Sequence, residues 1–424
     1  MPFPFRLLFL CGVIIFLDWY FFHAVQMFMR TSTPAKRTIV SMVYWGITLA
    51  SLSAILFSLF VPLHHLPHFV RVYIFSFFII IGISKLIGSV FLLVDDGMRL
   101  ASWLWLKGAS MLASWQGSRN GLASDAVSFP RKQFLSNLAL IGAALPFSAF
   151  IYGMVRGAYN YTVHKVSVNL PNLPKEFNGF KIVHISDIHI GSFQNSAPLE
   201  KAFALINAQK PDIIFFTGDL VNNRADEAAP HIETLKKLRA EYGVFSTIGN
   251  HDYGDYVKWD STEAKRENFE QLQQVHTKAG WTLLMNEHRV LERGAAKLAV
   301  IGIENWGAAM NFPKRGDLKR AASGTESTPV RLLLSHDPSH WDAQVRKEFG
   351  DIDVTFSGHT HGAQFGIEIP GFRWSPVQYF YKQWAGLYRD GTQYLYVNRG
   401  LGFLGYPGRV GISPEITVME LRTA

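Results

Sequence analysis

Residues 181–191 read KIVHISDIHIG, and this stretch decides the fold. A short apolar, β-branched run, Lys181–Ile185, leads into the polar triplet Asp187-Ile188-His189. Runs of this kind, bounded by a small polar residue, are typical of buried strands that end in a loop. The stretch therefore predicts a strand that delivers a carboxylate and an imidazole to a loop at its carboxyl end.

Four further blocks repeat this arrangement downstream. Each follows a short apolar run: Gly218-Asp219 follows Asp212–Phe216, Gly249-Asn250-His251-Asp252 follows Val244–Ile248, Ser335-His336-Asp337 follows Val330–Leu334, and Gly358-His359-Thr360-His361 follows Asp353–Phe356. Helical stretches separate several of these runs, at Ala197–Gln209 and Ala229–Tyr242. Because open α/β sheets gather polar residues at the carboxyl ends of their strands, we expect the five blocks to meet at one edge.

Among the side chains of the five blocks are the two carboxylates of Asp187 and Asp219, one side-chain amide and four imidazoles, with His251 to spare. Such a set suits two adjacent divalent cations with one carboxylate between them, and paired-metal sites handle phosphoryl transfer well. Mixed nitrogen and oxygen ligation is compatible with manganese, iron, zinc, cobalt or nickel. The sequence therefore predicts a reaction class without fixing the metal.

The order D-x-H, GD, GNHD, a later H and GHxH resembles the signature of the calcineurin-like metallophosphoesterases. All five blocks are present, between about residues 180 and 362. The ending Asn398-Arg399-Gly400-Leu401-Gly402, with Arg409 and Pro414-Glu415-Ile416, resembles the membrane-tethered bacterial branch of that superfamily. One block alone would be weak, whereas five in order are a specific signal.

The resemblance implies a role for each donor. It assigns one metal to Asp187, His189 and His361, and a second to Asn250, His336 and His359. Asp219 would bridge the two, and a bridging water or hydroxide would be the nucleophile. His251 would protonate or stabilise the leaving group. Asp252 would orient His251 by accepting its other N–H, or would be an ordinary loop carboxylate.

The resemblance also implies the architecture of residues 161–424: two mixed β-sheets packed face to face, with helices outside. Arg399 or Arg409 could contact a substrate phosphate or could serve a turn. The stretch Pro370–Tyr388 is rich in aromatic residues. It could bind acyl chains or touch a membrane interface, or it could pack against the rest of the domain.

Residues 1–160 form the other predicted domain, an all-α transmembrane one. Apolar runs long enough to span a membrane lie at Phe3–Phe28, Ile39–Val61, Phe69–Val94 and Phe134–Val155. Met98–Trp115 could be a fifth span, but Lys107 at its centre favours a helix lying in the interface. Asp18 and Lys85 fall inside two of the spans. Since charges are costly at membrane depth, we expect them to pair; the alternative is that each side chain extends to the membrane interface independently.

Basic residues near the spans predict the orientation. With four spans, one side receives eight basic residues, among them Arg30, Lys36 and Arg37, and the other side receives Arg6, Arg71 and Arg156. The excess on the first side predicts that it is cytoplasmic and that the second domain lies outside the cytoplasm. The resemblance to a bacterial branch makes the membrane a bacterial inner membrane.

The net charge of +8 does not require a nucleic-acid partner. Much of it flanks predicted spans, and no basic run or stacking motif favours nucleic-acid binding. We therefore expect a membrane-anchored phosphoesterase acting on a phosphodiester or pyrophosphate, in a lipid or envelope-related substrate. The alternatives are a broad phosphomonoesterase or nucleotide phosphodiesterase, and a membrane sensor or scaffold without turnover.

Overall fold

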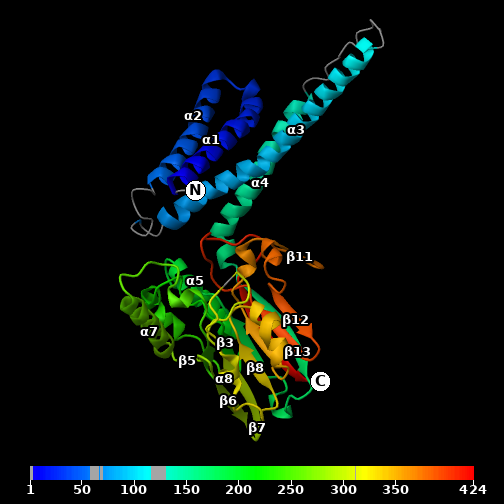
Figure 1. Cartoon of the computed structure of the whole chain (residues 1–424). Helices are drawn as coiled ribbons and strands as arrows, with labels where there is room; N and C mark the ends of the chain where they lie inside the picture. The colour runs from blue at the N-terminus through cyan, green and yellow to red at the C-terminus, as the bar shows by residue number, and fades with distance from the viewer. Residues whose placement is uncertain (1–2, 58–65, 67–69, 116–129, 311) are drawn as a thin grey trace. The chain divides into compact units, whose positions relative to one another are not determined.

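The computed structural model describes residues 3–57, 66, 70–115, 130–310 and 312–424 (Figure 1). The chain divides into two compact units, the first ending at Ile151 and the second beginning at Tyr152. This division falls inside a helix, upstream of the boundary at residue 160 that the sequence indicates. The last residues of that helix therefore belong to the second unit.

The first unit is built of long helices. They are α1 (Phe3–Phe28), α2 (Pro34–Phe57), α3 (Phe75–Trp115) and α4 (Pro130–Val155). In the part of the chain that the structure describes, four segments are long and apolar enough to cross a membrane, and they overlap the four predicted spans. The length and composition of these helices therefore identify the protein as an integral membrane protein.

Helix α3 continues without a break from Phe75 to Trp115. The predicted separation of Met98–Trp115 from the third apolar run is therefore wrong, because these residues continue the same helix. Gly97 and Gly108 lie within it, but a glycine inside a helix costs only about 1 kcal/mol and need not interrupt it. A helix of 41 residues is about 60 Å long at ~1.5 Å per residue, roughly twice the hydrocarbon thickness of a bilayer.

The predicted pairing of Asp18 with Lys85 is confirmed. Lys85 Nζ lies 2.5 Å from Asp18 Oδ1, and both side chains are buried. Thr48 donates a hydrogen bond of 2.5 Å to the other carboxylate oxygen. The Tyr44 hydroxyl donates to the Asp18 carbonyl oxygen at 2.8 Å. This network ties α1, α2 and α3 together, as expected for charges that must be satisfied inside a bilayer.

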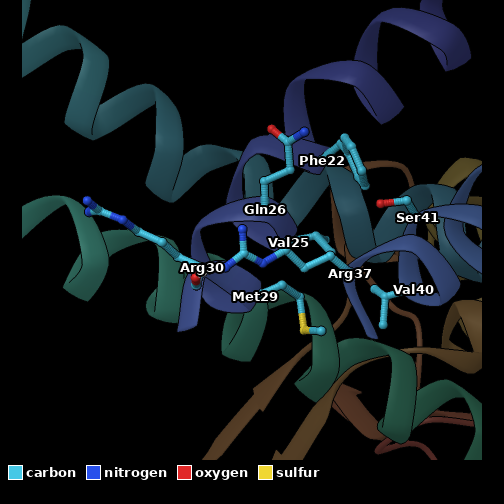
Figure 2. Close-up of a pocket in the computed structure, with 8 residues that line it drawn as sticks. All are labelled: Phe22, Val25, Gln26, Met29, Arg30, Arg37, Val40 and Ser41. Atoms are coloured by element: carbon cyan, nitrogen blue, oxygen red, sulfur yellow. Dashed lines mark hydrogen bonds between the residues drawn. The ribbon is translucent and has the colours of Figure 1, made fainter. Parts of the chain in front are cut away.

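A small pocket lies at one end of α1 and α2 (Figure 2). Its lining comes from both helices and the turn between them: Phe22, Val25, Gln26, Met29, Arg30, Arg37, Val40 and Ser41. Arg37 donates from Nε to the Ser32 carbonyl oxygen at 3.0 Å and also bonds the Arg30 carbonyl oxygen. Arg37 therefore stabilises the turn, and the pocket contains none of the predicted metal ligands.

The second unit contains two six-stranded sheets. The strand order of the first is β1 (Thr162–Leu170), β14 (Glu415–Thr423), β2 (Lys181–Ile185), β3 (Ile213–Phe216), β4 (Val244–Ser246), β5 (Trp281–Leu283). That of the second is β12 (Gly386–Asp390), β13 (Gln393–Val397), β9 (Val354–Ser357), β8 (Arg331–Leu334), β7 (Ala296–Gly302), β6 (Glu287–Arg293). Each sheet mixes parallel and antiparallel pairs. The strands predicted beside the five blocks are all present.

Successive side chains of a strand point to opposite faces of its sheet, and the apolar ones form three layers: one between the two sheets and one on the outer face of each sheet. In β3, Ile213 and Phe215 belong to a core shared by both sheets, with Val354 and Phe356 of β9. The intervening Ile214 and Phe216 pack with Phe203 of α5 (Ala197–Ala208) and Leu272 of α7 (Thr262–Lys278). On the outer side of the second sheet, Leu333 packs with Trp341 and with Leu318 of α8 (Leu318–Ala322). This arrangement confirms the predicted double β-sheet sandwich flanked by helices.

The helix predicted over Ala229–Tyr242 is much shorter. Residues Ala225–His231 form a 3-10 helix, and α6 covers only Ile232–Leu235. Pro230 lies inside this segment and cannot donate a backbone hydrogen bond, which limits a regular α-helix there.

Candidate metal centre

All seven predicted ligands lie just beyond the carboxyl ends of strands. Asp187, Asp219 and Asn250 follow the parallel strands β2, β3 and β4 of the first sheet. His336 and His359 follow β8 and β9, which are parallel neighbours in the second sheet. Because the carboxyl ends of parallel strands share an edge, loops from both sheets converge. The predicted meeting of remote segments is present in the structure.

Five of these side chains leave backbone in the left-handed region. The residues are Asp187, His189, Asp219, His359 and His361, with φ between 47° and 71°. Non-glycine residues rarely adopt this conformation, and where they do they cluster at functional sites. The loops are therefore shaped to direct these donors inward at some cost in backbone energy.

The first donor group comprises Asp187, His189 and His361, whose ligand atoms lie within 4.8 Å of one another. All three residues are buried. His189 Nε2 lies 3.1 Å from His361 Nε2, and His361 Nε2 lies 3.3 Å from Asp187 Oδ1. These atoms surround a space suited to one cation.

The second donor group comprises Asp219, His336 and His359, again within 4.8 Å. Asn250 Oδ1 lies 2.8 Å from His359 Nδ1 and 3.1 Å from His336 Nε2. The two imidazole nitrogens are themselves 3.2 Å apart. The amide oxygen therefore joins this group, as the resemblance implies.

Asp219 lies between the two groups. Its Oδ2 is 3.3 Å from His336 Nε2 and 3.6 Å from His189 Nε2. One carboxylate thus approaches an imidazole of each group. This position is the one required of a ligand shared by two cations.

Hydrogen bonds outside the centre orient the ring nitrogens that face it. His336 Nδ1 donates to the Thr217 carbonyl oxygen at 2.6 Å, which directs Nε2 inward. Burial alone would lower the pKa of His336, but the adjacent Asp219 carboxylate raises that pKa to about 10, so a cation bound by Nε2 would displace a proton. His359 Nε2 lies 2.8 Å from the Tyr381 hydroxyl, and that hydroxyl donates to Asp337 Oδ2 at 3.3 Å. His359 therefore donates from Nε2 and directs the Nδ1 lone pair inward.

Lone pairs that face one another at about 3 Å repel unless a proton or a cation lies between them. Partners that fix the outer nitrogen of each ligating histidine are typical of metal sites. The buried nitrogen and oxygen donors therefore fit two divalent cations held by mixed ligation.

The carboxylates of the centre are ionised. Burial alone would raise the pKa of Asp187, but the adjacent His361 outweighs burial and holds that pKa well below its usual range. The pKa of Asp219 is likewise low, because His336 and His251 outweigh the effect of its burial. Burial lowers the pKa of His189 to about 3, so this imidazole is neutral and able to ligate.

Three residues of the centre were missed by the sequence analysis. Tyr381 and Asp337 orient His359 through the relay described above. The Tyr256 hydroxyl accepts from Asn250 Nδ2 at 2.8 Å, which turns the amide oxygen toward the metal donors. Asp337 lies inside a quoted block and could have been suspected. The two tyrosines carry no local signal, because only the tertiary fold brings them to the centre.

His251 lies beside the first donor group. Its ring stands 5.0 Å from that of His189, and its backbone N–H donates to Asp219 Oδ1 at 2.8 Å. His251 Nδ1 lies 2.7 Å from the Asn222 carbonyl oxygen, to which it donates. This bond leaves Nε2 as the nitrogen that can exchange a proton with a ligand.

The expected role of Asp252 in orienting His251 is wrong. The Asp252 carboxylate instead accepts four backbone N–H groups, from Asp219, Leu220, Val221 and Gly249, at 2.8 to 3.2 Å. The His251 ring N–H that Asp252 was expected to accept is instead accepted by the Asn222 carbonyl oxygen. Asp252 therefore holds together the two loops that carry Asp219 and Asn250.

Arg399 and Arg409 are also structural. Arg399 is buried and forms ion pairs with Glu415 and Glu368. Arg409 is buried and donates to the carbonyl oxygens of Gly400 and Gly402. Its Nη2 also lies 3.3 Å from His361 Nδ1. These contacts support a role of both arginines in stabilising turns and not the alternative role of contacting a substrate phosphate.

Comparisons with known proteins agree with this geometry. Residues 5–158 match the family model described as "Probable Calcineurin-like phosphoesterase, transmembrane domain". Residues 180–363 match the model described as "Calcineurin-like phosphoesterase". The two matches cover the two parts of the chain separately.

Several curated relatives are similar to more than half of the chain. The metallophosphoesterase YkuE of Bacillus subtilis is 32% identical over 303 residues, 69% of this chain and 98% of the relative. A transmembrane protein with a metallophosphoesterase domain from Danio rerio is 30% identical, over 65% of this chain and 60% of that relative. The UDP-2,3-diacylglucosamine pyrophosphatase LpxG of Chlamydia trachomatis is 29% identical, over 59% of this chain and 86% of the relative.

Proposed function

The chain belongs to the calcineurin-like metallophosphoesterases, and from that premise we propose that it hydrolyses a phosphodiester or pyrophosphate bond in a lipid or envelope-related substrate. The observation that carries this proposal is the meeting of two three-residue donor groups around Asp219. Helices that can span a membrane place this centre on a membrane-anchored chain.

The residues divide the chemical work. One cation would be held by Asp187, His189 and His361. The other cation would be held by Asn250, His336 and His359, and Asp219 would bind both cations. When bound, such a pair supplies an activated water and neutralises charge on the phosphoryl group. His251 would give a proton from Nε2 to the leaving oxygen, while the Asn222 carbonyl keeps its ring oriented. Tyr381 and Asp337 would keep His359 in the ligating tautomer.

Two observations support a lipid-related substrate. Anchoring an enzyme in a bilayer raises its effective concentration toward substrates in the same membrane. In addition, one relative is named for a pyrophosphatase activity on UDP-2,3-diacylglucosamine. That molecule couples a nucleotide to acyl chains through a pyrophosphate, which is the type of bond proposed here.

Substrate profiling tests this proposal. Full-length protein loaded with manganese is expected to hydrolyse bis-p-nitrophenyl phosphate and to release phosphate from lipid-linked pyrophosphates in mixed micelles. An Asp219→Asn protein serves as the inactive reference, because Asp219 approaches both donor groups. Exclusive turnover of p-nitrophenyl phosphate or of cyclic nucleotides would contradict the lipid-related substrate and favour a broad phosphomonoesterase or nucleotide phosphodiesterase.

We also propose that the second unit lies outside the cytoplasm, at the inner membrane of a bacterium. The support is the excess of basic residues flanking one side of the four spans. A phosphatase reporter and a fluorescent-protein reporter, each fused after residue 160, test the orientation. Phosphatase activity without fluorescence is expected. The reverse result would contradict the proposal and would allow a cytoplasmic nucleotide-sugar substrate.

A further inference from the structure

The aromatic stretch after the last metal ligand divides into a packed base and an exposed tip. At the base, Tyr381 and Trp384 are buried in a small cluster with Ile412. At the tip, a separate two-stranded hairpin pairs β10 (Ile367–Ile369) with β11 (Phe372–Trp374). The predicted packing against the rest of the domain is therefore confirmed for one half of the stretch, and the other half is exposed.

The tip carries a concentrated apolar surface. Among the described residues from 160 onward, nine large apolar side chains are exposed: Tyr256, Val290, Met310, Phe365, Ile367, Ile369, Phe372, Tyr379 and Phe380. We call five of them the hairpin surface: Ile367, Ile369, Phe372, Tyr379 and Phe380, with exposed fractions from 48% to 73%. Five of the nine thus fall within fourteen residues of the chain, and exposed apolar groups gathered in this way mark interaction sites.

Strand pairing gives the hairpin one apolar face and one polar face. Ile369 lies opposite Phe372 and Ile367 opposite Trp374, so these side chains share one face. Glu368 and Arg373 are paired on the other face. That polar face is fastened to the unit, since Glu368 forms an ion pair with Arg399 and Arg373 donates to the Ala385 carbonyl oxygen at 2.5 Å. The apolar face is therefore held outward by the polar one.

The hairpin is attached close to the end of the fourth span. Gly366 donates to the Val410 carbonyl oxygen at 2.9 Å, and Phe365 forms a β-bridge with Val410. The neighbouring Arg409 donates from its backbone to the carbonyl oxygen of Gly153 at 3.2 Å. Gly153 lies in the last turn of α4, within the candidate span 133–159. All these contacts belong to the second unit, so the hairpin base lies next to the carboxyl-terminal end of α4.

The same hairpin adjoins the metal centre. Ser375, directly after β11, donates to the Gly362 carbonyl oxygen at 2.8 Å. Thr360 donates to the Trp384 carbonyl oxygen at 2.7 Å. Both acceptor and donor flank His361, a predicted metal ligand. The aromatic stretch is therefore hydrogen-bonded to the loop that carries this ligand.

We propose that the hairpin surface docks into the interfacial layer of the lipid bilayer and holds the metal centre against the membrane. The candidate span 133–159 ends within a few residues of Gly153, to which the hairpin base is linked through Arg409, and strands of three residues are about 10 Å long. Isoleucine and phenylalanine on one face of the hairpin, with the Tyr379 hydroxyl 3.4 Å from Trp374 Nε1, match the residues that insert at membrane interfaces. This inference about the substrate rests on the proposed function: the substrate would be an amphiphile that enters the metal centre from the bilayer.

Site-specific labelling tests the docking without reference to catalysis. Cys11 is the chain's single cysteine, so a Cys11→Ser background accepts one new thiol. An environment-sensitive fluorophore is attached to Ile369→Cys or Phe380→Cys, with Val290→Cys of β6 as the matched exposed control. Figure 1 shows β6 and β11 at opposite ends of the second unit. Full-length protein is placed in nanodiscs of phosphatidylethanolamine and phosphatidylglycerol, with or without nitroxide-labelled lipid.

Blue-shifted emission, quenched by nitroxide lipid, is expected at positions 369 and 380 and not at 290. Equal quenching at all three positions would overturn the proposal. So would a blue shift that depends on protein concentration and not on lipid, since a second copy of the chain would then cover the surface. Because the readout is spectroscopic, it holds even if the proposed hydrolytic activity fails.

A second experiment measures the rate of hydrolysis. The double variant Ile369→Glu/Phe380→Glu is compared with Val290→Glu on hexadecyl p-nitrophenyl phosphate in nanodiscs and on methyl p-nitrophenyl phosphate in solution. The double variant is expected to lose about tenfold on the hexadecyl ester, equivalent to ~1.4 kcal/mol of docking, and to keep its rate on the methyl ester. Equal losses on both esters would contradict docking, and absence of turnover on either by the parent protein would contradict the proposed function instead.

Discussion

Replacing Asp219 by asparagine is expected to lower kcat/KM at least about a thousandfold, equivalent to ~4 kcal/mol of transition-state stabilisation. The Asp219 carboxylate is the only side chain among the described donors that approaches an imidazole of both groups, at 3.3 and 3.6 Å. An amide can still accept the His251 backbone N–H at Oδ1, so the loop is preserved. The negative charge that holds two cations together is lost. Steady-state kinetics and elemental analysis measure the two consequences.

Asp226→Asn is the matched control for this change. Asp226 is exposed and pairs only at the surface with Arg224, so its activity and metal content should equal those of the parent. A comparable thermal transition in both variants would show that the fold is retained. An Asp219→Asn protein with two metals per chain and near-parental turnover would contradict the bridging role.

Replacing His251 by glutamine is expected to lower kcat about a hundredfold to a thousandfold on esters with alkyl leaving groups. The loss should be much smaller with p-nitrophenolate, which leaves without a proton. Metal content should stay at the parental value, because the ring lies beside the first donor group and is not needed as a ligand. The leaving-group dependence separates proton donation from a general structural defect.

His288→Gln is a suitable control because it removes the same kind of contact elsewhere. His288 Nδ1 lies 2.9 Å from the Ala321 carbonyl oxygen, much as His251 Nδ1 lies 2.7 Å from that of Asn222. The His288 variant should retain activity on both classes of ester. If His251→Gln slowed both classes equally, or lost metal, His251 would act as a ligand or a structural residue and not as an acid.

The donors of the centre could be predicted because each follows a buried strand in the chain itself. Lys181–Ile185 and the four later runs have the apolar composition of central parallel strands, and glycine or serine marks the end of each. The fold then needs only to bring the carboxyl ends of these strands together. The pairing of Asp18 with Lys85 was predictable for a similar reason, since a bilayer leaves a charge few other partners.

Other features depend on tertiary contacts that no local pattern records. Tyr381 reaches His359 from a stretch whose composition is equally suited to packing. Asp252 lies next to His251 in the chain, yet its turn directs the carboxylate toward the backbone of Asp219. Sequence adjacency therefore suggested the wrong partner. The short α6 shows that helical composition over 229–242 is overridden by Pro230 and the neighbouring loop contacts.

The two-faced character of the hairpin is intermediate between these cases. The alternation of Ile367, Glu368 and Ile369 is visible in the sequence, but its meaning depends on the partner strand. Only the structure shows that the polar face is fastened by Arg399 and that the apolar face remains exposed.

Metal titration of the full-length protein tests the account most directly. Protein purified in detergent is stripped with a chelator, and manganese is added back in known equivalents while bound metal and diester hydrolysis are recorded together. Two bound ions per chain are expected, with turnover absent from the stripped protein and restored fully only with the second ion. A polypeptide that binds no metal and keeps full turnover in excess chelator would contradict it.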